Sequence, residues 1–213
     1  MIRVVVADDH TIVRDGLRHL LAAAGDIEVA GEARDGKEVL ERVRALTFDV
    51  LLMDMSMPGK SGIELIRQVR AEKPKLRILI LSMHEEHQYA VRAIRAGASG
   101  YLTKESASLQ LVEAIRKVAA GGAFISSEVA QQLALGAMPG ASGPLHASLS
   151  DREFQILLLI ASGKSITEIA EQLFLSVKTV STHKSNILQK MQMQTQGELI
   201  RYALTHQLIA PDA

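Results

Sequence analysis

Two apolar stretches of the sequence end in carboxylates. Asp54 closes the run 48–54, and the pair Asp8 and Asp9 closes the run 2–7. Because strand interiors disfavour aspartate, each acid should mark the point where a strand leaves the core. Parallel strands bring their carboxyl ends to one edge of a sheet, where ligands bind near the reversal of strand order. We therefore expect one carboxylate pocket built from distant parts of the chain.

Such a pocket needs a cation. Two carboxylates about 4 Å apart repel each other by about 4 kcal/mol at an effective dielectric of about 20. All-oxygen ligands without histidine or cysteine favour a hard ion. A small open site with few carboxylates suits Mg²⁺ (or Mn²⁺) better than Ca²⁺.

Two further residues end apolar runs: Ser82 follows the run 78–81, and Lys104 follows the run 101–103. A hydroxyl, an ammonium, a cation and a carboxylate together suit phosphoryl transfer, in which an aspartate can be the nucleophile. Each residue alone has an ordinary explanation, as a helix cap, a turn former or a solvated charge. Their joint placement at the ends of four strands favours the phosphoryl-transfer site.

The elements that must position these residues alternate between β-rich runs and helical patterns, which is typical of βα units around a parallel sheet. Nearly continuous apolar strands indicate helices on both faces. The predicted strands are Ile2–Ala7, Ile27–Ala33, Val50–Asp54, Arg77–Ser82 and Gly100–Leu102. The predicted helices are 11–24, 36–46, 61–72, 86–96 and 107–119, with Gly25, Gly97 and Gly121 as expected C-terminal caps. The predicted fold is a doubly wound α/β domain with a five-stranded parallel sheet.

The bulk composition restricts the class of protein. The 213 residues include 24 basic and 24 acidic residues and no cysteine. Balanced charge excludes a histone-like binder, and the lack of cysteine excludes disulfides and thiolate metal sites. The N-terminus lacks a basic region leading into an apolar segment, and no apolar run approaches the roughly 20 residues of a membrane span. We expect a soluble cytoplasmic protein with no membrane partner.

The pattern changes after residue 121. A short helix is predicted over Ser127–Leu135, and three glycines and two prolines in residues 136–144 indicate a flexible linker. Beyond Ser148 the patterns are helical, in about four segments. The predicted organisation is an α/β domain over 1–121, a short helix and flexible linker over 122–147, and an all-α domain over 148–213.

The C-terminal segment predicts a helix-turn-helix. Ser150 with Glu153, and Ser165 with Glu168, fit capping boxes that precede apolar helical stripes. Ser176 is expected to cap a third helix directly after the second. The buried face of that helix is predicted to hold Val177, Val180, Ile187 and Met191. Its exposed face has three lysines and no acid, which suits a groove-reading helix, although a solvated polar face is the simpler alternative.

The acidic motif resembles the receiver domain of two-component response regulators. Matching elements occur in order over residues 1 to about 121: Asp8-Asp9, Asp54 to Pro58 with Gly62, Ser82-Met-His, and Tyr101 to Lys104. The resemblance implies a flavodoxin-like sheet of strand order 2-1-3-4-5, with Asp54 as the phosphoacceptor. It implies that Mg²⁺ is bound by Asp9 and Asp54, by the Ser56 carbonyl, and by Asp8 through water.

The same resemblance implies a switch. Lys104 would pair with the phosphoryl group and Ser82 would hydrogen-bond it, and the Tyr101 ring would then turn inward. The face around 86–96 and 100–102 would become the signalling surface. Glu105 departs from the family pattern, in which proline often follows the lysine through a cis bond. This departure bears on the cis bond and not on the phosphoacceptor.

The tail resembles the LuxR-type helix-turn-helix over about residues 148–210, through the segments 149–153, 165–170 and 176–183. Joined to a receiver, it makes the chain similar to the NarL/FixJ class of response regulators. By this resemblance Ser181, Thr182 and Ser185 would face base edges. Residues expected near phosphates are Lys178, Thr179, Lys184, Asn186 and Lys190. His183 is expected to be partly packed, and the last helix, about 196–207, is similar to the one by which such domains pair on DNA.

The resulting prediction is a phosphorylation-dependent transcription regulator, and not a metabolic enzyme. A sensor histidine kinase would phosphorylate Asp54, and the chain would bind double-stranded DNA as a homodimer. A phosphatase of the haloacid-dehalogenase kind also uses a strand-end aspartate, but it would normally want a second acid where this chain has Ser56. A receiver whose tail binds RNA or protein is the other alternative, although such a tail would not need a basic third helix.

Overall fold

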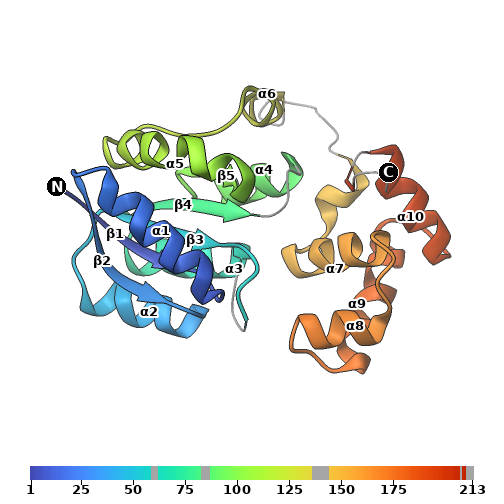
Figure 1. The fold of residues 1–213 in the computed structure, drawn as a ribbon. Helices are drawn as coiled ribbons and strands as arrows, with labels where there is room; N and C mark the ends of the chain where they lie inside the picture. The colour runs from blue at the N-terminus through green and yellow to red at the C-terminus, as the bar shows by residue number, and fades with distance from the viewer. Residues whose placement is uncertain (59–61, 83–86, 136–143, 207, 210–213) are drawn as a thin grey trace. The chain divides into compact units, whose positions relative to one another are not determined.

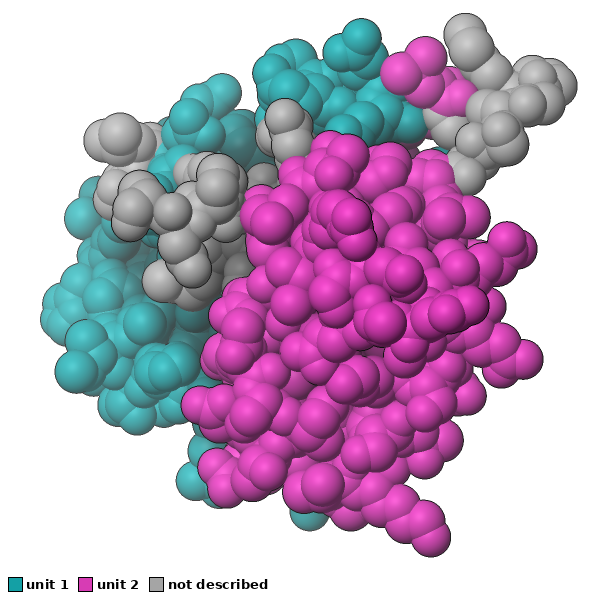
Figure 2. Space-filling view, turned by 90° about the vertical axis from the view of Figure 1, so that its right-hand side faces the viewer, with its two compact units in different colours: residues 1–132 teal, residues 133–213 magenta. Residues whose placement is uncertain are grey.

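A computed structural model of the chain describes residues 1–58, 62–82, 87–135, 144–206, 208 and 209. The chain divides into two compact units, residues 1–132 and residues 133–213, which Figure 2 shows in different colours. Within the described ranges, no helix is both long enough and apolar enough to cross a membrane.

The first unit is built on a five-stranded parallel sheet in the order β2-β1-β3-β4-β5 (Figure 1). The strands are β1 (Ile2–Ala7), β2 (Ile27–Ala33), β3 (Val50–Asp54), β4 (Arg77–Ser82) and β5 (Gly100–Thr103). The helices are α1 (Thr11–Ala23), α2 (Gly36–Ala45), α3 (Gly62–Glu72), α4 (His87–Ala96) and α5 (Lys104–Ala119), and the boundary between the units falls within α6 (Ser127–Leu135). The predicted fold class and strand order are confirmed.

The sheet is covered on both faces. Strand β3 is buried along its whole length, as its apolar sequence predicts. One face packs against α1 and α5, in a core that includes Val4, Leu52, Leu21 and Leu111. Residues that alternate with these along the strands point to the opposite face. The buried apolar residues of α2, α3 and α4 include Val39, Ile66 and Ala93.

Helix α5 begins three residues before the predicted start at 107. The Thr103 side chain accepts a hydrogen bond from the Ser106 backbone N–H, which caps the helix directly after β5. Glu105 lies in the first turn, where an acid suits the helix dipole. Lys104 is therefore the first residue of a helix, and its position is fixed by regular structure on both sides.

Glycines end three of the helices as predicted. Gly25, Gly97 and Gly121 adopt φ values of +77°, +115° and +93°, which residues with side chains rarely adopt. No cis peptide bond occurs in the residues that the structure describes.

The second unit is all-helical. Its elements are a 3-10 helix η1 (Leu145–Ser148) and the helices α7 (Asp151–Ala161), α8 (Ile166–Gln172), α9 (Val177–Lys190) and α10 (Gln196–Thr205). Both predicted capping boxes are present, at Ser150 and Ser165. A third, from Thr195 to Glu198, begins α10. The linker predicted over residues 136–144 lies outside the described residues except for Pro144.

Helices α8 and α9 form the predicted helix-turn-helix. The Leu175 backbone N–H donates to the Ala170 carbonyl at 2.9 Å, and Ser176 caps α9 through the Thr179 backbone N–H. Three of the four residues predicted for the buried face of α9, Val180, Ile187 and Met191, are buried. The prediction for Val177 is wrong: its side chain is exposed, because the first residue of α9 lies at the turn and not over the core.

Candidate functional site

The sheet brings the four predicted strand-end residues to one edge. Asp54 and Ser82 are the last residues of β3 and β4, and Asp8 and Lys104 directly follow β1 and β5. The four strands are parallel, so their carboxyl ends meet. Strand order reverses at β1 and β3, the point where doubly wound sheets bind ligands.

Two buried carboxylates share one ammonium group at this edge. Lys104 Nζ lies 2.7 Å from Asp8 Oδ2 and 3.3 Å from Asp54 Oδ1. The side chains of Asp8 and Asp54 are 1% and 3% exposed. Asp54 Oδ1 accepts no hydrogen bond from the residues that the structure describes. A buried oxygen without a hydrogen-bond donor is available to a ligand of the pocket.

The pKa values of Asp54 and Lys104 are both shifted by burial and by neighbouring charges. Burial raises the pKa of Asp54 above its usual range, and the nearby Asp8 adds to this, while Lys104 lowers the pKa but does not outweigh burial. For Lys104, burial lowers the pKa, and the contacts with Asp8 and Asp54 outweigh it, so the pKa is raised. The ammonium group is therefore held charged, but its contact with Asp54 does not offset the burial of that carboxylate.

A second acidic position adjoins the buried pair. Asp9 is exposed, and together with Asp8 and His10 it forms a group whose oxygen and nitrogen atoms lie within 4.8 Å of one another. His10 Nδ1 lies 3.1 Å from Asp9 Oδ1 and 3.3 Å from Asp8 Oδ1. Asp8, Asp9 and the Asp54 oxygen that accepts no hydrogen bond are the hard donors that a divalent cation prefers, so the residues present fit such an ion.

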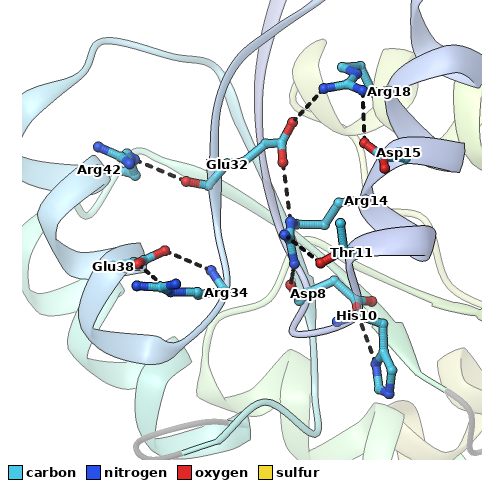
Figure 3. Close-up of polar contacts among 10 residues, drawn as sticks. All are labelled: Asp8, His10, Thr11, Arg14, Asp15, Arg18, Glu32, Arg34, Glu38 and Arg42. Atoms are coloured by element: carbon cyan, nitrogen blue, oxygen red, sulfur yellow. Dashed lines mark hydrogen bonds and ion pairs between the residues drawn. The ribbon is translucent and has the colours of Figure 1, made fainter.

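Polar contacts that sequence reasoning missed hold the loop after β1 (Figure 3). Arg14, on α1, donates to the Asp8 backbone carbonyl at 2.7 Å and to the Glu32 carboxylate at 3.2 Å. The His10 backbone N–H donates to Asp8 Oδ1 at 2.8 Å. These contacts fix Asp8 from its main chain as well as from its side chain. The sequence signal for the contact between Arg14 and Asp8 is a spacing: Arg14 lies one helical turn after His10.

The remaining predicted residues of this edge lie as follows. Ser82, the last residue of β4, is 1% exposed, and Tyr101, the second residue of β5, is 9% exposed, so both are buried. Ser56 is exposed in the turn two residues after Asp54. Met83 to Glu86, which follow Ser82, lie outside the described residues.

The exposed face of α9 carries the residues predicted to contact DNA. Ser181, Thr182, Ser185 and Asn186 are exposed. Thr179 and His183 are partly buried, and His183 is thus partly packed, as predicted. Small hydroxyl side chains on an exposed helix can donate to or accept from base edges and phosphates.

The three lysines of α9 differ in their surroundings. Lys178 is exposed at the N-terminal turn. Lys184 is partly buried and donates to Gln196 Oε1 of α10 at 2.7 Å. Lys190 forms an ion pair with the buried Glu153 of α7 at 2.7 Å. Sequence reasoning treated the three as one basic face, whereas two of them contact neighbouring helices.

Comparison with known proteins assigns both parts of the chain to domain families. Residues 4–116 match the family model of the response regulator receiver domain, and residues 147–203 match that of bacterial regulatory proteins of the luxR family. The response regulator UvrY of Escherichia coli K12 is 40% identical over 209 residues, covering 98% of this chain and 96% of UvrY. The response regulator GacA of Pseudomonas aeruginosa is 39% identical over 210 residues, covering 98% of each chain.

Solved structures give the same assignment. A structure of RcsB from Salmonella typhimurium superposes with a TM-score of 0.70 at 29% identity, covering 96% of this chain and 97% of RcsB. RcsB in complex with DNA superposes with a TM-score of 0.59 at 29% identity, covering 96% of this chain and 98% of RcsB. With both domain families matched in order along the chain, the protein belongs to the NarL/FixJ class of two-component response regulators, with a receiver domain and a LuxR-type DNA-binding domain.

Proposed function

We propose that Asp54 is the phosphoacceptor of this response regulator. The observation that carries the proposal is the buried Asp54 carboxylate, which lies 3.3 Å from Lys104 Nζ beside the buried Asp8. An Asp54 oxygen would attack the phosphorus of a phosphohistidine on a sensor kinase, forming a P–O bond as the P–N bond breaks. The leaving imidazole would take up a proton, and the phosphoryl group would stay on Asp54.

The cation of the pocket is proposed to be Mg²⁺, with Mn²⁺ as a substitute. Asp9, Asp54 and the Ser56 carbonyl would bind it directly, and Asp8 would act through water. When bound, the ion would neutralise charge on the phosphoryl oxygens. Lys104, held charged by Asp8, would neutralise the other side.

Ser82 and Tyr101 are proposed to report the phosphoryl group. The two buried side chains lie on the adjacent strands β4 and β5, Ser82 as the last residue of β4 and Tyr101 as the second residue of β5, so movement of one would change the space open to the other. A Ser82 hydroxyl drawn towards the phosphoryl group would let the Tyr101 ring turn inward. This would change the surface formed by α4 and β5.

Helix α9 is proposed to read the major groove of double-stranded DNA. Ser181, Thr182 and Ser185 would face base edges. The residues proposed to lie near phosphates are Lys178, Thr179, Lys184 and Asn186. Pairing through α10 would give a homodimer on paired half-sites.

The proposed organisation is a receiver over residues 1–121 and a helix-turn-helix domain over 148–213, with a short helix and linker between them. The proposed location is the cytoplasm, where a sensor histidine kinase as phosphodonor and promoter DNA as target would be available. Unphosphorylated and phosphorylated chains would differ in their affinity for DNA.

Phosphotransfer to an Asp54→Asn variant tests the proposal. The wild-type chain should take up radiolabel from a small phosphodonor in the presence of Mg²⁺, and the variant should not, because an amide is not a nucleophile here. Asp15→Asn, on the exposed side of α1, is the matched control and should be labelled like the wild type. Equal labelling of Asp54→Asn would refute the assignment of the phosphoacceptor.

A further inference from the structure

The last residue of α9 forms an ion pair with a residue in the first turn of α7. Lys190 Nζ lies 2.7 Å from Glu153 Oε2. The Glu153 side chain is only 5% exposed, whereas that of Lys190 is 43% exposed. The contact joins the C-terminal end of the proposed recognition helix to a buried carboxylate on a different helix.

Glu153 is fixed independently of Lys190. Its Oε2 atom also accepts the Ser150 backbone N–H at 2.8 Å, and its own N–H donates to Ser150 Oγ at 3.3 Å. Burial raises the pKa of Glu153, but hydrogen bonds from Lys190 and Ser150 outweigh it and leave the pKa below its usual range. The carboxylate is therefore charged, and its orientation is set by the capping box.

Arg152, the residue before Glu153 in α7, contacts the end of α8, the other helix of the motif. Arg152 Nη2 donates to the carbonyl of Leu173, the C-cap residue that directly follows α8, at 3.2 Å. Arg152 and Glu153 thus contact the C-terminal ends of α8 and α9 from one turn of α7.

We infer that Glu153 and Lys190 form a positioning pair for DNA recognition, in which the lysine neutralises Glu153 and not a DNA phosphate. The inference rests on the proposed reading of DNA by α9. A buried carboxylate that loses its cation is strongly destabilised, whereas an exposed phosphate retains its counterions when one lysine is absent. Fixing the end of α9 on α7 sets the tilt at which Ser181 and Ser185 approach the bases.

The salt dependence of DNA binding tests the inference, because each lysine that neutralises a phosphate steepens it. The full-length chain would be titrated with a duplex selected by the wild type from a random-sequence library, and with a scrambled duplex. The variants are Lys190→Met, Glu153→Gln, their double mutant, and Lys178→Ala as the control. Lys178 is the exposed lysine of the same helix.

A positioning pair predicts a specific pattern. Lys190→Met should weaken binding to the selected duplex by about tenfold, as for the loss of one charge-assisted hydrogen bond, without changing the salt slope. Lys178→Ala should make the slope shallower by about 0.9, the value for one phosphate contact. Glu153→Gln should weaken specific binding like Lys190→Met, and the double mutant should be no worse than either single variant. Binding to the scrambled duplex should be unchanged by Lys190→Met.

The opposite pattern overturns the inference. A lysine bound to phosphate would give a shallower slope in Lys190→Met, with equal losses on both duplexes. Glu153→Gln would then leave binding unchanged or strengthen it by releasing Lys190. A wild-type chain that binds neither duplex would instead refute the proposed reading of DNA, and the inference with it.

Loss of folding is separated from loss of positioning by a conservative variant. Lys190→Arg keeps the charge and the reach, so it should restore specific affinity and thermal stability together. If Lys190→Met does not fold, Glu153→Gln carries the same test, since it keeps a hydrogen-bond acceptor at the cap. A folded Glu153→Gln variant with full affinity for the selected duplex would contradict the inference.

Discussion

At the level of single residues, the receiver site combines groups that oppose folding. Asp8 and Asp54 are buried at the same edge of the sheet, and Lys104 is the ammonium group that contacts both. Burial is the main reason that the pKa of Asp54 is raised, and the nearby Asp8 adds to it, because the single ammonium of Lys104 does not outweigh both effects. The site thus retains an attraction for further positive charge, which the proposed cation would supply.

Replacing Asp54 by Asn should stabilise the chain at neutral pH. The pKa of Asp54 is higher in the folded than in the unfolded chain, so the folded state binds more protons as the pH rises through the carboxyl range. The contribution of Asp54 to the free energy of unfolding is fully present below the pKa that this carboxyl has in the unfolded chain. It is lost as the pH rises through the higher pKa of the folded chain. In EDTA at pH 7.5, Asp54→Asn should raise the melting temperature by about 4 °C.

The gain should be smaller at about pH 4, because the raised pKa of Asp54 favours the protonated carboxyl as the pH falls. Thermal melts at the two pH values, followed by circular dichroism, measure this difference. Asp15→Asn, with a half-exposed side chain on α1, should show little change at either pH. An equal gain at both pH values would contradict the explanation through the Asp54 charge.

Mg²⁺ should stabilise the wild-type chain, and this stabilisation should depend on Asp9. A ligand that binds only the folded state at a hundredfold excess over its Kd adds about 2.7 kcal/mol to the free energy of unfolding. Asp9→Asn removes a proposed direct ligand that is exposed and makes no contribution to the core. The shift in melting temperature on adding Mg²⁺ should therefore be largely lost. A full shift in this variant would exclude Asp9 as a ligand.

At the level of elements, the edge of the sheet beyond β5 is extended by the chain that follows α5. The Tyr101 backbone N–H donates to the Phe124 carbonyl at 2.9 Å, and the Phe124 N–H donates to the Ser99 carbonyl at 3.1 Å. Gly100 lies between these bonds and forms a bridge with Phe124. The close approach requires a residue without a side chain.

Gly100→Ala should destabilise the receiver. A Cβ atom at this position would lie 2.8 Å from Leu79 Cδ1 and 2.9 Å from the Phe124 carbonyl oxygen. Relief of this overlap should cost about 1–3 kcal/mol. Gly16→Ala is the matched control, because a Cβ there has no neighbour within 4 Å and lies in α1, where alanine is favoured by about 0.5–1 kcal/mol. Urea unfolding should show opposite shifts, and equal shifts would contradict the steric argument.

At the level of the whole molecule, the chain consists of two units with separate cores. In the second unit, η1 contributes His146, which is 2% exposed and lies with Nδ1 2.9 Å from the Tyr202 hydroxyl. Its ring also contacts that of Phe154 at 5.7 Å between centroids. The helix-turn-helix core therefore includes residues that precede the first capping box.

A fragment of residues 144–213 should be more stable than a fragment of residues 148–213. The longer fragment retains His146 and its contacts with α7 and α10, worth about 2 kcal/mol for a buried side chain of this size. His146→Ala in the longer fragment should reproduce most of the loss. Urea unfolding measures the difference, and equal midpoints for the two fragments would place η1 outside the folding unit.

The sequence by itself determined the order and type of the elements. Strands were found at their observed positions because apolar runs and strand-end aspartates are local signals, and helix ends were found from Gly25, Gly97 and Gly121. Ser150 and Ser165 fixed two helix starts, since a capping box involves only four consecutive residues. The candidate site followed from one rule of topology, which brings the carboxyl ends of parallel strands together.

Only the tertiary structure decided which charges meet. Lys104 and Asp8 are 96 residues apart in sequence, and Lys190 and Glu153 are 37 apart. No periodic pattern encodes such pairs, because they depend on the relative placement of whole elements. For the same reason the sequence could not assign separate surroundings to the lysines of α9, or predict the exposure of Val177. Patterns along the chain specify its helices and strands, whereas the partner of each buried charge is set by packing between them.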